Sequence, residues 1–88
     1  MSFEFDPDKS LVNKVKHRID FVEEAQALWL DSAALLAPAT SKTEERYLFV
    51  GKIGTVLWTA VVTFRGPNLR LISVRRARTE EKKAYESQ

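Results

Sequence analysis

Five arginines gather within fourteen residues near the end of this 88-residue chain: Arg65, Arg70, Arg75, Arg76 and Arg78. A guanidinium group stays charged at physiological pH, and its planar fork binds phosphate through two hydrogen bonds. At a phosphodiester it could also stabilise the charge that develops on the equatorial oxygens during cleavage. The cluster therefore predicts a phosphate-binding surface. The alternative is a charged sheet edge that only keeps the protein in solution.

The charge of the chain is unevenly distributed. Residues 65–83 carry seven Lys or Arg and two Glu, a local charge of +5. Residues 1–64 carry seven Lys or Arg and nine Asp or Glu, a charge of −2, so the net charge of +2 hides the difference. A local excess of positive charge favours an anionic partner, and nucleic-acid phosphate is the first candidate.

Three further side chains could transfer protons or contact a base. His17, the only histidine, is a candidate general acid or base, although a histidine in the last turn of a helix more often contacts the final carbonyl groups. Glu45 could accept the proton of an RNA 2′-hydroxyl, or form an exposed charge pair with Arg46. Tyr85 could stack on a base or donate a proton, or pack the last helix onto the sheet. One histidine and no cysteine exclude a structural zinc site and predict no metal.

The first elements that position these residues are a short strand and a helix. Phe3–Phe5 alternates apolar and polar residues, as a strand does. Asp6 and Pro7 start a helix that should end near His17, because aspartate caps a helix and proline fits its first turn. The apolar periodicity predicts a buried helix face made of Leu11, Val12, Val15 and Ile19.

Asp20 begins a predicted second helix that ends at Asp31. Glu23 lies three residues on, an arrangement close to a capping box. The predicted buried stripe of this helix comprises Phe21, Val22, Ala25, Leu28 and Trp29. The connection to the first helix is about two residues long, so the two helices should pack as neighbours.

In the second half of the chain, apolar and β-branched runs predict strands at 33–37, 45–52, 56–65 and 69–74. A polar loop is expected at 38–43, and a final helix is expected to be capped by Thr79. Short turns make neighbouring strands antiparallel. We therefore expect one α+β domain over residues 1–88, with a small antiparallel sheet, two N-terminal helices packed on one face and a C-terminal helix.

The alternation within the strands predicts an open basic face. Trp58 and Ala60 should face the helices, whereas Thr63 should face away from them. In the following strand, Ile72 and Val74 are expected to alternate with Leu71, Ser73 and Arg75. If Ser73 and Arg75 share the face of Thr63, the side of the sheet away from the helices is polar and positively charged.

The sequence lacks membrane and export signals. No segment approaches the roughly 18 apolar residues that a membrane span needs. The first residues have no basic start followed by an apolar run. We therefore expect a cytoplasmic protein without a membrane partner.

Several stretches resemble the BrnT toxins of type II toxin–antitoxin systems, and they cover nearly the whole chain in order. In the first half they are Phe3–Ser10, Asn13, Lys16–Phe21 and Glu24-Ala25. In the second half they are Glu45–Tyr47, Gly51–Gly54, Ile72–Arg78, Glu81 and Tyr85. Two positions depart from the family. Phe5 stands where tryptophan is usual, and Arg18 stands where glycine is usual, so the turn before Asp20 could differ.

The resemblance implies a RelE-like fold and a ribonuclease that slows translation. Its partners would be RNA and a BrnA-like antitoxin with a ribbon-helix-helix module, through which the complex would bind operator DNA. No cofactor is implied. The residues assigned to catalysis are Arg75, Arg65, Arg70, Glu45, His17 and Tyr85. Those assigned to RNA binding are Arg76, Arg78, Lys82, Lys52 and Arg46. The alternative function is an inactive toxin copy that only binds RNA or its antitoxin.

Overall fold

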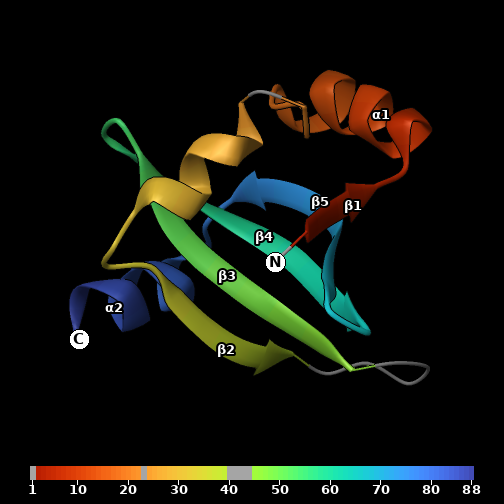
Figure 1. The fold of residues 1–88 in the computed structure, drawn as a ribbon. Helices are drawn as coiled ribbons and strands as arrows, with labels where there is room; N and C mark the ends of the chain where they lie inside the picture. The colour runs from red at the N-terminus through yellow and green to blue at the C-terminus, as the bar shows by residue number, and fades with distance from the viewer. Residues whose placement is uncertain (1, 23, 40–44) are drawn as a thin grey trace.

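A computed structural model of the chain describes residues 2–22, 24–39 and 45–88 (Figure 1). Its elements in order are β1 (Ser2–Phe5), α1 (Pro7–His17), the 3₁₀ helix η1 (Ala25–Leu30), β2 (Leu35–Ala39), β3 (Arg46–Ile53), β4 (Val56–Arg65), β5 (Asn68–Arg76) and α2 (Thr79–Glu86). The strands form one sheet in the order β1-β5-β4-β3-β2. The α+β class and the predicted strands are confirmed to within a few residues. Most of the predicted loop at 38–43 lies outside the described residues.

The sheet is mixed, so the prediction of an antiparallel sheet is wrong in one place. Strands β2, β3, β4 and β5 pair antiparallel in succession, whereas β1 pairs parallel with β5. The reason is the connection after β1. Because α1 follows β1 in the chain, no short turn joins β1 to its neighbour β5, and the two strands can run parallel. Helix α1 and η1 lie on one side of the sheet, and α2 lies on the other (Figure 1).

The structure has one N-terminal α-helix, so the predicted second helix is wrong. After α1 the chain makes a turn and then the short helix η1. Asp20 does make a reciprocal capping pair, but with Glu24: its amide donates to Glu24 Oε1 at 3.0 Å, and its Oδ1 accepts from the Glu24 amide at 3.1 Å. Glu23 lies outside the described residues. The pair closes a turn that redirects the chain before an α-helix can form.

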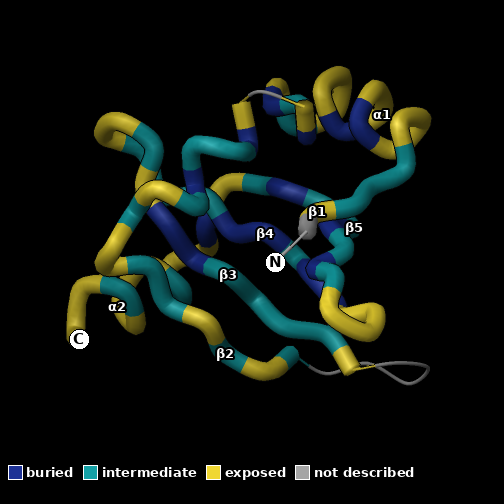
Figure 2. The backbone as a smooth tube through the Cα atoms, viewed as in Figure 1, coloured by how far each residue is buried: buried dark blue, intermediate teal, exposed yellow. Residues whose placement is uncertain are grey.

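Apolar residues of η1, β4 and β5 form the centre of the core (Figure 2). From the predicted stripe, Phe21, Ala25 and Leu28 are completely buried, whereas Val22 is 59 % exposed. The full cluster comprises Ile19, Phe21, Ala25, Leu28, Ala60, Val62, Leu69, Leu71 and Val74. Gly51 in β3 lets η1 approach closely, because a Cβ at this position would lie 3.1 Å from Leu28 Cδ2.

Helix α1 packs through polar side chains, which contradicts the predicted apolar face. Leu11, Val12 and Val15 are exposed, and only Ile19, beyond the helix, is buried. The buried residues of α1 are Ser10 and Asn13. The helix is therefore held by hydrogen bonds rather than by its apolar stripe.

The physical reason is an unpaired strand edge. β1 covers β5 only as far as Leu71, so the backbone of Val74 has no neighbouring strand on that side, whereas β4 pairs with it on the other. The Asn13 amide takes that place: Nδ2 donates to the Val74 carbonyl at 2.9 Å, and Oδ1 accepts from the Val74 amide at 3.1 Å. Nδ2 also donates to the carbonyl of Ile19 at 2.8 Å. Buried backbone groups need such partners, and one asparagine supplies them here.

Candidate nucleic-acid interface

A register shift in β5 distributes the arginines over both faces of the sheet. The pairing with β4 shifts between Val61 and Val62, so Ile72 is an extra residue in β5. Leu71 consequently joins Val74 on the buried face, against the predicted alternation. Arg70, Ser73 and Arg75 lie opposite residues of the face that carries Thr63, as expected, whereas Arg76 lies opposite Trp58 on the helix-covered face.

Arg65 and Arg70 meet at one end of the open face. Oε1 of Glu4 lies 4.0 Å from Nε of Arg65 and 3.5 Å from Nη1 of Arg70. Glu45 belongs to the same end, because its carbonyl accepts a hydrogen bond from Thr63 Oγ1 at 2.6 Å. The Arg65 side chain is 61 % exposed, and Glu45 is exposed as well. This end therefore brings together three of the residues assigned to catalysis.

Arg75 lies at the other end of that face in a partly buried ion pair with Glu81 of α2. Its two terminal nitrogens donate to the two Glu81 oxygens at 2.7 and 2.8 Å. Glu81 also accepts from Thr59 Oγ1 and from the Arg78 amide. The hydrogen bonds from Arg75, followed by those from Arg78 and Thr59, lower the pKa of Glu81 to about 2. Arg75→Ala would therefore disturb the docking of α2 as well as any phosphate contact.

Tyr85 is held by a carboxylate. Its hydroxyl donates to Asp31 Oδ2 at 2.7 Å, and the Lys52 amide donates to the same oxygen at 2.8 Å. The bond raises the pKa of Tyr85, and together with the Lys52 amide it lowers the pKa of Asp31. This geometry matches the alternative interpretation of Tyr85, in which it anchors the last helix. Nothing in the sequence pattern singled out Asp31 as its partner.

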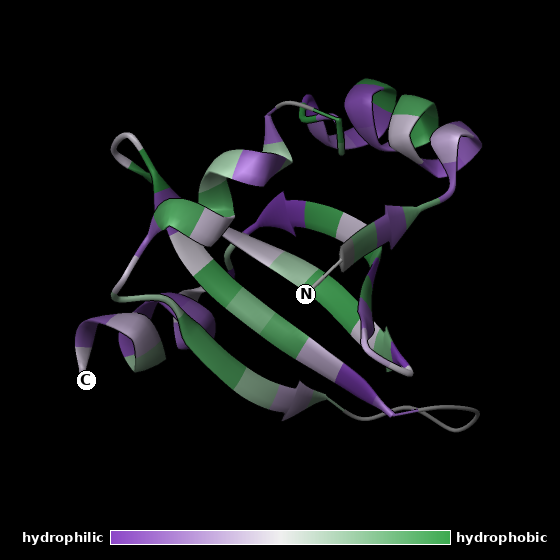
Figure 3. Cartoon of the chain, in the orientation of Figure 1, coloured by the Kyte–Doolittle hydropathy of each residue, from purple (hydrophilic) through white to green (hydrophobic). Residues whose placement is uncertain are grey.

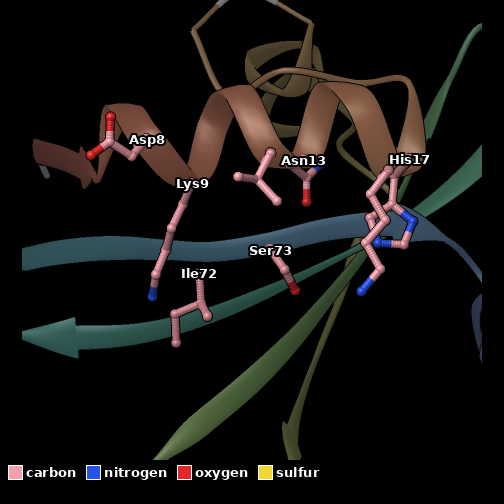
Figure 4. A pocket seen from close by; sticks show the side chains of 8 residues that line it. Asp8, Lys9, Asn13, His17, Ile72 and Ser73 are labelled. Carbon is pink, nitrogen blue, oxygen red and sulfur yellow. The ribbon is translucent and has the colours of Figure 1, made fainter.

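A groove runs between α1 and the edge of β5. Its walls are Asp8, Lys9, Val12, Asn13, Lys16, His17, Ile72 and Ser73, and its volume is about 270 Å³. Figure 4 shows Lys9 and His17 extending from α1 on the side where Ile72 and Ser73 lie. His17 is half-buried, whereas Lys9 and Lys16 are exposed. The groove thus places the only histidine beside two lysines.

The groove continues into a pocket at the C-terminal end of α1. This pocket, of about 400 Å³, is lined by Lys16, His17, Arg18 and Arg76. We call these four residues the basic corner. Three permanent cations around one imidazole make a site suited to an anion. His17 and Arg76 were assigned from sequence, whereas Lys16 and Arg18 were not. The uninterrupted run Lys16-His17-Arg18 was the signal that could have identified them.

Arg18 adopts a strained backbone conformation within the basic corner. Its φ and ψ are 64° and 26°, and its amide donates to the Lys14 carbonyl at 2.9 Å. The turn therefore keeps the left-handed geometry that glycine favours. A residue with a Cβ adopts this conformation at a cost of roughly 1 kcal/mol. Arg18 therefore places a guanidinium at the pocket, whereas a glycine at this position would place no side chain there.

Arg76 connects the basic corner to a second basic pocket near α2. That pocket, of about 340 Å³, is lined by Lys52, Thr55, Val56, Leu57, Arg76, Lys82 and Glu86. The guanidinium carbon of Arg76 lies 5.6 Å from the centroid of the Trp58 ring, which supports the side chain. Three residues assigned to RNA binding, Lys52, Arg76 and Lys82, therefore meet here. Two others lie elsewhere: Arg78 precedes α2 and is exposed, and Arg46 is the first residue of β3.

Across residues 2–22, 24–39 and 45–88, no three His, Cys, Asp or Glu side chains are grouped so that they could hold a metal ion. None of the helices in the described part of the chain is long and apolar enough to cross a membrane.

Comparison with known proteins gives one family match. Residues 5–81 match the sequence model described as the ribonuclease toxin, BrnT, of type II toxin–antitoxin systems. Among curated proteins, no sequence matches the chain significantly. The family match covers the groove, the basic corner and the Arg75–Glu81 pair, whereas Lys82 of the second basic pocket lies just beyond it.

Proposed function

Because the chain belongs to the BrnT family of ribonuclease toxins of type II toxin–antitoxin systems, we propose that it cleaves RNA at the basic corner. The observation that supports this location is the pocket in which Lys16, Arg18 and Arg76 surround His17. Apart from His17, the catalytic residues assigned from sequence lie on or beside the sheet face that carries Thr63, where α2 packs. There, Arg75 is engaged by Glu81 and Tyr85 by Asp31. In the basic corner, a proton-transferring side chain shares one pocket with three cations.

His17 acts as the general base in the proposed mechanism. Imidazole is the side chain that most readily exchanges a proton near neutral pH. His17 removes the proton of the RNA 2′-hydroxyl, whose oxygen attacks the adjacent phosphorus. The bond from phosphorus to the 5′-oxygen then breaks, which leaves a 2′,3′-cyclic phosphate, and the departing 5′-oxygen takes a proton from water to become a 5′-hydroxyl. Glu45 cannot share this step, since it contacts Thr63, five positions along β4 from the Trp58 that pairs with Arg76.

Lys16, Arg18 and Arg76 supply electrostatic stabilisation. Negative charge builds up on the equatorial oxygens and on the leaving 5′-oxygen during cleavage, and fixed cations stabilise it most where water is partly excluded. We propose that these side chains make the reaction independent of a metal ion. Cleavage should then persist in excess EDTA.

The flanking basic residues bind the RNA backbone. Lys9 lies in the groove on one side of the corner, and Lys52 and Lys82 lie in the pocket on the other side. These cations would bind successive phosphates and make binding depend steeply on salt concentration. Arg65 and Arg70 lie at the far end of the sheet and would bind a longer RNA there.

The biological role proposed here follows the family. Cleavage of cellular RNA in the cytoplasm would slow translation and arrest growth. An antitoxin with a ribbon-helix-helix module would neutralise the toxin and carry the complex to operator DNA. The resemblance of the chain to the family, in order and over nearly its full length, supports these roles.

Inducible expression in bacteria tests the proposal. The chain should arrest growth and degrade RNA, whereas His17→Ala and Arg76→Ala should not. Lys83→Ala is the matched control, because it removes one exposed cation from α2 that lines none of these pockets. In vitro, His17→Ala should still bind labelled RNA while losing cleavage by at least a hundredfold. Cleavage that survives His17→Ala would refute the proposed base. Binding without cleavage by the unmodified chain would favour the inactive-copy alternative.

A further inference from the structure

The outer side of α1 carries an apolar stripe that nothing in the described structure covers. Leu11, Val12 and Val15 are 70, 63 and 86 % exposed. Figure 2 shows most of α1 as exposed, and Figure 3 shows hydrophobic residues on the same helix. Three exposed aliphatic side chains on one short helix are more than isolated surface residues, and such patches mark interaction sites.

The stripe is continuous with the groove at the proposed active site. On a helix of 3.6 residues per turn, Leu11 and Val15 lie on one side and Val12 lies about a quarter-turn away. Val12 is also a wall of the groove, together with Lys16 and His17. A partner that covers the stripe and extends past Val12 therefore reaches the histidine.

The charge around the stripe indicates what kind of partner fits it. Residues 9–19 contain four cations and no Asp or Glu, and Asp8 is the one carboxylate among the residues that line the groove. Lys14 is paired with Glu24 at 2.6 Å, but Lys9 and Lys16 line the groove. The complementary partner presents aliphatic side chains flanked by carboxylates. RNA satisfies the charge but leaves the aliphatic stripe without a partner.

We propose that an acidic, aliphatic segment of the antitoxin docks on Leu11, Val12 and Val15 and blocks the groove beside His17. The proposal rests on the proposed function, since it takes the basic corner as the RNA site. The antitoxin then neutralises the toxin by blocking the RNA site directly, because its carboxylates occupy the positions of the RNA phosphates. It also makes apolar contacts with α1 that RNA cannot make, so it binds more tightly than RNA does. An RNA-competitive mode of inhibition follows from this arrangement.

A double variant, Leu11→Ser with Val15→Ser, separates antitoxin binding from catalysis. Neither residue lines a pocket of the basic corner, and both are exposed, so the fold and RNA cleavage should be unchanged. Affinity for the antitoxin encoded with this chain should fall at least tenfold, measured by calorimetry with purified proteins. Leu30→Ser is the matched control, because Leu30 is 85 % exposed at the end of η1 and lies on another element. Its antitoxin affinity should be unchanged.

The outcomes distinguish this proposal from the proposed function. Unchanged antitoxin affinity of the double variant would overturn the docking site, whether or not the chain cleaves RNA. Loss of RNA cleavage in a folded double variant would also overturn it, because the stripe would then belong to the RNA site. A dimer of the free chain that becomes monomeric in the double variant would identify a second copy as the occupant and refute the antitoxin assignment. If the unmodified chain fails to cleave RNA but the affinity falls as expected, only the proposed function fails.

Discussion

The Glu81 carboxylate should make the stability of this protein depend on acidic pH. Arg75 and its other donors lower the pKa of Glu81 from 4.5 to about 2, and the side chain is only 13 % exposed. A pKa that is lower in the folded state stabilises the fold above the unfolded value. That stabilisation is lost as the pH falls from 4.5 towards 2. At about 1.36 kcal/mol per pKa unit the upper limit is about 3 kcal/mol, of which about 1 kcal/mol is lost by pH 3.5.

Glu81→Gln removes the charge while keeping the size of the side chain. At pH 7 the variant should be less stable by about 2–3 kcal/mol, which corresponds to a decrease in Tm of roughly 10–20 °C for a domain of this size. Urea unfolding, followed by fluorescence of the two tryptophans, should show that this stability difference between variant and unmodified chain is about 1 kcal/mol smaller at pH 3.5. Glu80→Gln, an exposed neighbour on α2, is the control and should differ little. A Glu81→Gln difference that is absent at pH 7, or equal at both pH values, would refute the reasoning.

Three other substitutions test the interface and its supports. Arg18→Gly should stabilise the fold by about 1 kcal/mol by relieving the positive φ, yet reduce RNA cleavage at least tenfold; a stabilised variant with full activity would remove Arg18 from the site. Asn13→Asp keeps the shape but loses both donors, so it should cost about 2–4 kcal/mol in urea unfolding and speed hydrogen exchange at the Val74 amide. Tyr85→Phe should lower the urea midpoint slightly, because the bond to Asp31 is lost, and leave cleavage intact; loss of cleavage would instead return Tyr85 to the catalytic group.

Local signals in the sequence determined the elements that depend on neighbouring residues. Asp6 and Pro7 start α1 as predicted, and the Asp6 carboxylate accepts from the Asp8 amide at 2.9 Å. The strand over Val56–Arg65 has the predicted bounds, since its β-branched and aromatic residues favour an extended chain in any context. Thr79 is the first helical residue of α2 rather than its cap, which is Arg78.

Long-range contacts decided the packing of these elements. The apolar periodicity of α1 predicts that Leu11 and Val15 are buried, but the unpaired edge of β5 required the amide of Asn13 instead. No local pattern reveals that β1 stops short of Val74, because the strand pairing involves residues more than sixty positions apart. A buried backbone group without a partner costs more than exposing an aliphatic side chain, so the polar side of the helix turned inward.

The candidate site depends both on local sequence signals and on long-range contacts. The sequence alone determined a fold class, a charge asymmetry and a set of arginines that could bind phosphate. The tertiary structure decided which of them share a pocket, since the extra residue at Ile72 and the alternation of β5 direct Arg75 and Arg76 to opposite faces. Arg75 thereby meets Glu81 on one side, whereas Arg76 joins the Lys16-His17-Arg18 run on the other. Glu81 is only six residues from Arg75, but the pair forms because α2 folds back onto this face of the sheet. The meeting of Arg76 with residues 16–18 depends on where α1, about sixty residues earlier in the chain, packs on the sheet.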